Sequence, residues 1–191
     1  MVVSTLERDA ELMLRVRDGD LTSFTSLLER HRLPVVNFLS RMVGNQAIAE
    51  ELAQDVFLRI YRSRGSYEPT AKFTTWLFRI ATHLALNHIR DRRHEKNSES
   101  LERERRDGSV RQFADQVLNI EQSMVQQARF IEVRQAIEVL PAKQRAAVLM
   151  HKYHEMDYSQ IARALGCSES ALKSLLFRAY ETLRSRLAHL A

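Results

Sequence analysis

The stretch SQIARALGCSESALKSLLFRAYETLRSRL, residues 159–187, has the pattern of a short helix, a turn and a longer helix. Asp157 can cap the first helix, with Gln160 three residues later at the spacing of a capping box. Gly166 supplies the turn, and Ser168 can cap the second helix. Two helices joined by a short turn that contains glycine have the geometry that fits the major groove of DNA. The stretch therefore predicts a helix-turn-helix.

The second helix of this pair divides into an apolar face and a polar face. Leu172, Leu176 and Ala179 recur at steps of three and four, so we expect them to face the core. The opposite stripe carries the candidate DNA-contacting residues, which are Ser170, Lys173, Ser174, Phe177 and Arg178. Lysine and arginine can contact phosphates or guanine, and serine can contact backbone or base. The aromatic ring of Phe177 favours a binding face over a plain solvated one, unless a neighbouring helix buries it.

The rest of the chain is also helical by its periodicity, and strand-like alternation is almost absent. We predict helices over residues 6–17, 21–43, 46–63 and 73–91, and again from residue 120 to the end. Residues 94–119 are charged and poor in large apolar side chains, which predicts a linker. The predicted fold is all-α, with two small helical domains, residues 1–93 and 120–191, joined by a flexible charged linker.

Charge and composition narrow the class of partner and the compartment. The formal net charge of +5 favours a polyanionic partner such as nucleic acid. The single cysteine, Cys167, excludes an intramolecular disulfide framework and fits a reducing compartment. Residues 1–20 lack the apolar core of a signal peptide, and no apolar run approaches the ~20 residues that span a bilayer. We expect a cytoplasmic protein without membrane insertion.

A second surface suited to nucleic acid is predicted on the helix at residues 73–91 and on the loop before it. The polar face of the helix and the loop together supply eight candidates: Tyr67, Lys72, Phe73, Trp76, Arg79, His83, Asn87 and Arg90. Basic residues interleaved with aromatic ones suit single-stranded or partly opened DNA, because charge holds the backbone and rings stack on unpaired bases. A flipped base can be held in such a loop pocket. The alternative is that Phe73, Trp76 and Phe78 simply belong to the core.

The helix at residues 46–63 carries acid instead of base on its polar face. Glu50, Glu51, Gln54 and Asp55 lie opposite its apolar residues. An acidic patch repels DNA, so it is better suited to a protein partner, with a plain solvated face as the alternative.

Catalysis is not indicated by any motif in the sequence. His151 and His154 can share one helical face, with Glu155 and Cys167 as further imaginable metal ligands, but no second pair at ligand spacing accompanies them. No phosphate-binding glycine loop or nucleophile motif occurs. We therefore expect no cofactor, no metal and no enzymatic activity.

Two long stretches resemble the sigma-70 family of bacterial transcription initiation factors. AEELAQDVFLRIYRSRGSYEPTAKFTTWLFRIATHLALNHIRDRR, residues 49–93, is similar to its conserved region two. LPAKQRAAVLMHKYHEMDYSQIARALGCSESALKSLLFRAYETLRSRL, residues 140–187, is similar to its region four. The absence of a region-three domain between them resembles the compact extracytoplasmic-function (ECF) subgroup.

The resemblance implies a role for each surface. Glu51, Gln54 and Asp55 would dock on the clamp helices of the β′ subunit of core RNA polymerase. The loop of residues 65–73 and the basic helix after it would bind the −10 element of promoter DNA and capture a flipped base. The final helix would contact the −35 element, and its domain would also touch the β flap. An anti-sigma protein commonly covers the polymerase-binding surfaces of such factors.

Three positions depart from the family pattern. The family often has basic residues where Leu175 and Tyr180 stand, and His83 replaces a frequent asparagine. We therefore expect the −35 and −10 contacts to differ in number or specificity from those of the family. The alternative function is an autonomous helix-turn-helix regulator that binds duplex operators, usually as a symmetric dimer.

Overall fold

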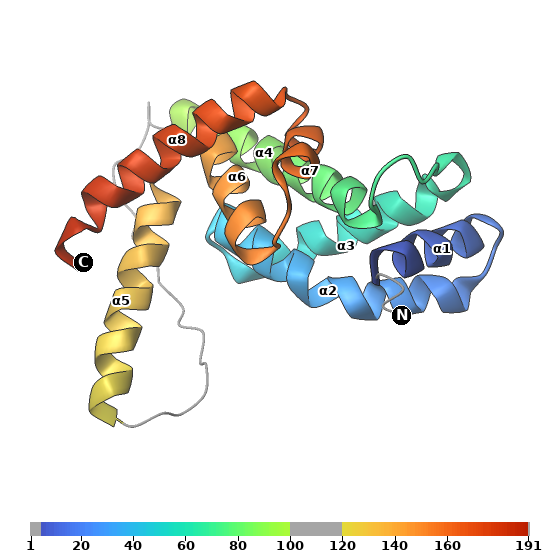
Figure 1. Ribbon diagram of the computed structural model, residues 1–191, viewed down its shortest axis with the longest axis horizontal. Helices are drawn as coiled ribbons and strands as arrows, with labels where there is room; N and C mark the ends of the chain where they lie inside the picture. The colour runs from blue at the N-terminus through green and yellow to red at the C-terminus, as the bar shows by residue number, and fades with distance from the viewer. Residues whose placement is uncertain (1–4, 100–119, 191) are drawn as a thin grey trace.

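The computed structural model describes the backbone of residues 5–99 and 120–190, and the side chains of residues 8–95 and 129–190. All regular elements in these ranges are helices, so the predicted all-α class is confirmed (Figure 1). Residues 100–119, most of the predicted linker, lie outside the described ranges.

The N-terminal half consists of four α-helices and one short 3-10 helix. They are α1 (Thr5–Arg17), α2 (Leu21–Val43), α3 (Gln46–Arg62), η1 (Arg64–Ser66) and α4 (Phe73–Glu99). Asp20 caps α2 by accepting hydrogen bonds from the backbone of Thr22 and Ser23, and Gly44 ends the helix in the left-handed conformation. α2 continues through Pro34, and α4 extends beyond the predicted boundary at residue 93. The core of this half is the apolar interior between α2, α3 and α4, including Phe38, Val56 and Leu77.

The C-terminal half consists of α5 (Ile120–Glu138), α6 (Ala142–Tyr153), α7 (Tyr158–Leu165), α8 (Glu169–Arg186) and the short η2 (Ala188–Leu190). The predicted capping box is present, because Asp157 and Gln160 each bond the other's backbone N–H through their side chains. Gly166 turns the chain at φ 64°, and Ser168 caps α8 by accepting from the backbone of Ala171. The predicted helix-turn-helix is therefore formed by α7 and α8.

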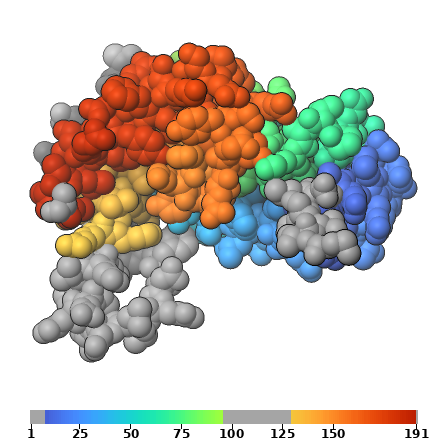
Figure 2. Space-filling view, viewed as in Figure 1, coloured from blue at the N-terminus to red at the C-terminus, as the bar shows by residue number. Residues whose placement is uncertain are grey.

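The two halves pack directly against one another. α7 lies along α4, and α6 meets α2 (Figures 1 and 2). The guanidinium of Arg41 on α2 stacks over the ring of Tyr153 on α6, 4.5 Å from its centroid. The predicted halves thus share an interface that neither periodicity nor composition indicated.

Arg145 joins three chain segments at this interface. Its Nη1 donates to the backbone carbonyl of Met42, near the end of α2, at 2.5 Å. Its Nη2 donates to the carbonyl of Glu138 and, at 3.3 Å, to that of Leu140. Burial lowers the pKa of Arg145, with the charge of Glu138 acting in the opposite sense. One side chain of α6 thus binds backbone at the ends of both α2 and α5.

His154, the residue directly after α6, packs against two phenylalanines of the other half that also contact each other. Its ring centroid lies 5.7 Å from that of Phe38 and 4.3 Å from that of Phe78. Within the described residues its buried Nε2 has no hydrogen-bond partner. Burial, and secondarily the charge of Arg41, lowers the pKa of His154 to about 4. The contact therefore requires a neutral imidazole.

Gly166→Ala should destabilise the chain by about 1–2 kcal/mol, because an L-residue with a side chain disfavours the left-handed conformation. A Cβ at this position would meet no atom within 4 Å, so the cost is conformational and not steric. Gly65→Ala is the matched control, because Gly65 has equally open space and no positive φ. Urea denaturation of both variants measures the difference, and an equal loss in the two would contradict the account.

Acidification should separate the two halves. The packed His154 has a pKa of about 4, below its ordinary 6.5, so the separated form binds the proton more readily between these values. The packing is at full strength above pH 6.5 and loses up to about 3 kcal/mol as the pH falls toward 4. Fluorescence energy transfer between dyes on the two halves, or small-angle scattering, measures the separation. His154→Phe keeps an aromatic ring against the two phenylalanines and should lack this pH dependence.

Candidate nucleic-acid interface

The basic helix α4 presents its polar face at a cleft. Arg79 and His83 are exposed, Trp76 and Asn87 are half-buried, and Arg90 lies exposed further along the helix. The steps of three, four and four residues between Trp76, Arg79, His83 and Asn87 place these side chains on one side of the helix. The sequence prediction of a shared face therefore agrees with the geometry of α4.

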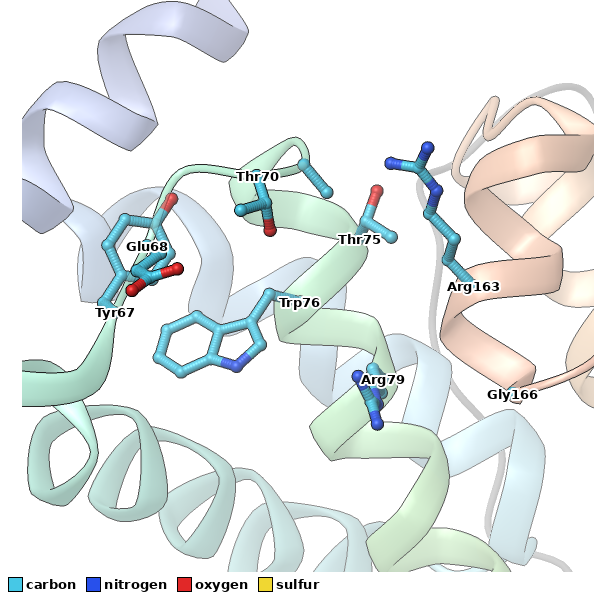
Figure 3. Close-up of a pocket in the computed structure, with 9 residues that line it drawn as sticks. Tyr67, Glu68, Thr70, Thr75, Trp76, Arg79, Arg163 and Gly166 are labelled. Carbon is cyan, nitrogen blue, oxygen red and sulfur yellow. The ribbon is translucent and has the colours of Figure 1, made fainter.

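The first part of the cleft lies between the loop before α4 and the end of α7. It has a volume of about 460 Å³ and is lined by Tyr67, Glu68, Thr70, Ala71, Thr75, Trp76, Arg79, Arg163 and Gly166. Figure 3 shows the Trp76 indole lying under the loop, with Arg79 one turn further along the same helix and Arg163 extending from the opposite wall. Cavities of a few hundred Å³ hold small ligands. The space suits a single nucleotide but not a duplex.

The cleft continues along α4 as a second hollow of about 530 Å³. Its lining includes Arg59 of α3, Arg79 and His83 of α4, and the C-terminal residues Ala164, Leu165 and Gly166 of the α7 end. Arg59 and Arg163 were not among the sequence candidates, because the sequence of α3 or α7 does not show that these helices lie beside the polar face of α4. The structure adds these two cations to the cleft.

Two predicted base-stacking residues lie in the interior instead. Tyr67 is 4% exposed and Phe73 is 1% exposed, so Phe73 belongs to the core and Tyr67 only edges the cleft. The Tyr67 ring centroid lies 5.0 Å from that of Trp76, and the Phe73 centroid lies 6.1 Å from it. These two rings support Trp76 from behind. Among the aromatic candidates on α4 and its loop, Trp76 is the one whose ring is half-exposed.

The polar face of α8 is open. Ser170, Lys173, Ser174, Phe177 and Arg178 are all exposed, and Phe177 is exposed to 67%. The Ser174 hydroxyl donates to the carbonyl of Ser170, and Nε of Arg178 donates to the carbonyl of Ser174 at 3.2 Å. The alternative that a neighbouring helix buries Phe177 does not hold in this arrangement. α8 runs along the outside of the molecule (Figure 1), and none of its residues lines the cleft.

Tyr180, one of the departures from the family pattern, faces the interior of the C-terminal half. Its hydroxyl and Nδ1 of His151 share a hydrogen bond of 2.7 Å. Burial raises the pKa of Tyr180 and lowers the pKa of His151, so both groups are held neutral. Leu175 is half-buried. Neither residue is part of the fully exposed stripe of α8.

The acidic face of α3 is exposed over Glu50, Glu51, Gln54 and Asp55. Glu50 accepts a hydrogen bond from the amide of Gln46 at 2.9 Å. Among the described residues, neither Glu51 nor Asp55 forms an ion pair. These two carboxylates are available to a basic partner surface.

A metal site and a membrane-spanning helix are two further features that the described residues could contain. In the described ranges no three His, Cys, Asp or Glu side chains come together in a way that could hold a metal. His151 and His154, the imagined ligand pair, instead contact Tyr180 and the two phenylalanines. None of the helices in those ranges is both long and apolar enough to cross a bilayer.

The sequence matches two family models. Residues 27–95 match Sigma-70 region 2, and residues 130–183 match Sigma-70, region 4. The first segment contains α3, the cleft-lining loop and most of α4, and the second contains the helix-turn-helix up to residue 183.

Curated relatives cover nearly the whole chain. It is 34% identical over 178 residues to RNA polymerase sigma factor CarQ from Myxococcus xanthus, which spans 93% of this chain and 97% of that protein. It is 29% identical over 188 residues to RNA polymerase sigma-H factor from Pseudomonas aeruginosa, spanning 96% and 95%. ECF RNA polymerase sigma factor SigW from Bacillus subtilis is 29% identical over 178 residues, spanning 92% and 95%.

Two solved structures share the fold. CnrH in complex with the cytosolic domain of CnrY has a TM-score of 0.67 at 18% identity, covering 96% of this chain and 99% of that one. The sigma factor RpoE in complex with the anti-sigma factor NepR, from Bartonella quintana, has a TM-score of 0.68 at 21% identity, covering 86% and 96%.

Proposed function

The chain belongs to the ECF group of the sigma-70 family, and we propose how its three surfaces divide the work of such a factor. It binds core RNA polymerase, directs the enzyme to specific promoters and helps to open DNA for initiation. The observation that carries the division is that one chain holds two different nucleic-acid surfaces, an open helix face and a nucleotide-sized cleft. An autonomous duplex-binding regulator needs only the first.

The exposed face of α8 contacts the −35 element as duplex. Lys173 and Arg178 supply positive charge for phosphates or guanine, and Ser170 and Ser174 supply short polar groups. The bulky ring of Phe177 suits contact with a thymine methyl group or the sugar backbone. This proposal places the domain boundaries near residues 93 and 120. The C-terminal domain is then the unit that binds duplex DNA.

The cleft beside α4 binds the −10 element as it opens. Trp76 stacks on an unpaired base, while Lys72, Arg79 and His83 hold the backbone and Asn87 and Arg90 extend the track along the helix. Tyr67 and Phe73 act behind Trp76 and do not touch the base themselves. Because the end of α7 forms the opposite wall, α7 must move aside before a strand can lie along α4.

The remaining contacts are with proteins. Glu51, Gln54 and Asp55 dock on the clamp helices of β′, and the C-terminal half contacts the β flap. One solved neighbour is CnrH in complex with the cytosolic domain of CnrY, and the other is the sigma factor RpoE in complex with the anti-sigma factor NepR; a comparable anti-sigma partner is proposed here. The chain performs no chemistry of its own, since the polymerase makes the RNA, and it acts in the cytoplasm where polymerase and promoter are found.

Run-off transcription with core polymerase on a genomic promoter library, with and without the chain, tests the function. New start sites should appear only in its presence. If none appears while the chain alone protects duplex DNA from cleavage, the autonomous regulator is the better description.

Lys173→Ala combined with Arg178→Ala should weaken −35-dependent initiation by about 30-fold or more, because each of the two lost base contacts costs about 1–3 kcal/mol and about 1.4 kcal/mol is a factor of ten. Core binding should be unchanged, since both residues lie on α8. Glu51→Ala combined with Asp55→Ala is the reciprocal control and should weaken core binding instead. Polymerase pull-down and abortive initiation assays separate the two effects. Loss of core binding in the α8 variant would contradict the assignment.

A further inference from the structure

A buried carboxylate on α1 has no role in the surfaces described so far. Asp9 is 2% exposed and lies before residue 27, where the match to region 2 begins. Its Oδ1 accepts from Arg30, and its Oδ2 accepts from Nε2 of His31 at 2.8 Å. Burying a carboxylate is costly unless it is paired, and here both oxygens have partners on α2. The pairing ties α1 to α2 at one defined point.

His31 extends this pairing to the aromatic residues behind the cleft. Its side chain is 9% exposed, and its ring centroid lies 5.3 Å from that of Phe73. Phe73 in turn contacts Tyr67 and Trp76, at centroid distances of 6.5 and 6.1 Å. A continuous series of contacts therefore runs from the Asp9 carboxylate to the one aromatic ring that the cleft exposes.

The loop side of the same cluster also feels Asp9. α1 packs against η1, the short helix just before Tyr67. The Tyr67 hydroxyl is buried and has no hydrogen-bond partner among the described residues. Its pKa is raised, first by burial and then by the negative charge of Asp9. The carboxylate thus acts on the cluster through His31 on one side and through Tyr67 on the other.

We infer that Asp9 is a positioning residue for strand opening: with Arg30 and His31 it holds the Tyr67, Phe73 and Trp76 rings in the arrangement that receives the unpaired base. The inference rests on the proposed function of the cleft. Asp9 touches no DNA in this assignment. It acts by keeping His31 and the rings above it from changing rotamer, so that Trp76 needs no reordering when a base arrives.

Asp9→Asn is the first test, because it keeps the shape of the side chain and removes its charge. Asp20→Asn is the matched control: it weakens a helix cap of the same half and does not touch the aromatic cluster. Trp76 is the single tryptophan of the chain, so its emission spectrum reports the cluster directly. The emission of Asp9→Asn should shift, and that of Asp20→Asn should not.

The second test measures the rate at which the holoenzyme opens a promoter. On a duplex promoter, Asp9→Asn should open about tenfold more slowly than wild type, a size typical for a misplaced positioning group. On a template already unpaired at the −10 element, the defect should shrink to about twofold or less, because the base no longer has to be captured from a stack. A variant that is merely less folded loses the same fraction on both templates. Such equal losses, or no loss at all, would overturn the inference.

His31→Gln tests the same inference if Asp9→Asn fails to fold. Glutamine can still donate to Asp9 and so keep α1 attached, but it removes the ring that packs on Phe73. It should reproduce both the emission shift and the duplex-specific defect, and wild-type behaviour would overturn the inference. Failure of the wild-type chain to start transcription with core polymerase would instead overturn the proposed function itself.

Discussion

The contact between the two halves governs what each surface can do. His154 packs against Phe38 and Phe78, and Arg145 donates to the backbone of α2, so the C-terminal half is anchored on the hydrophobic core of the N-terminal half. That anchorage brings the end of α7 to the polar face of α4. The same anchorage leaves α8 facing outward. In the proposed function, this arrangement restricts single-strand capture at the cleft and leaves α8 free to contact duplex DNA.

The two proposed nucleic-acid surfaces differ in the physical form of DNA that would fit them. α8 presents a convex row of charge, hydroxyls and one exposed ring, which suits a groove and its phosphates. The cleft presents one half-exposed indole over buried rings, with cations on both walls, which suits a base removed from its stack. A flipped base needs a rigid platform because any disorder in the platform subtracts from the binding free energy. The buried rings and the ion pairs beneath them supply that rigidity.

Local features were predictable from the sequence, and contacts between distant segments were not. The capping box at Asp157 and the turn at Gly166 depend on neighbouring residues alone, so their spacing was sufficient. Phe73 is buried because α1 and α2 pack against α4, and the periodicity of α4 gives no information about those helices. Asp9 was not among the sequence candidates, because its partners Arg30 and His31 lie more than twenty residues away. The end of α4 was underestimated because charged residues that resemble a linker are also good helix formers.

Because Arg145 binds the end of α2, separating the two halves also affects the N-terminal half. The last carbonyls of a helix have no partner within the helix, and the guanidinium occupies one of them, at Met42 of α2. A cation at that position also complements the negative end of the helix dipole. When the halves part, α2 loses both effects in its final turn, directly before the turn into α3. The acidic face of α3 is therefore thermodynamically linked to the position of the helix-turn-helix. A partner that binds the separated form also selects a looser α2–α3 junction. A partner that tightens this junction favours the packed form.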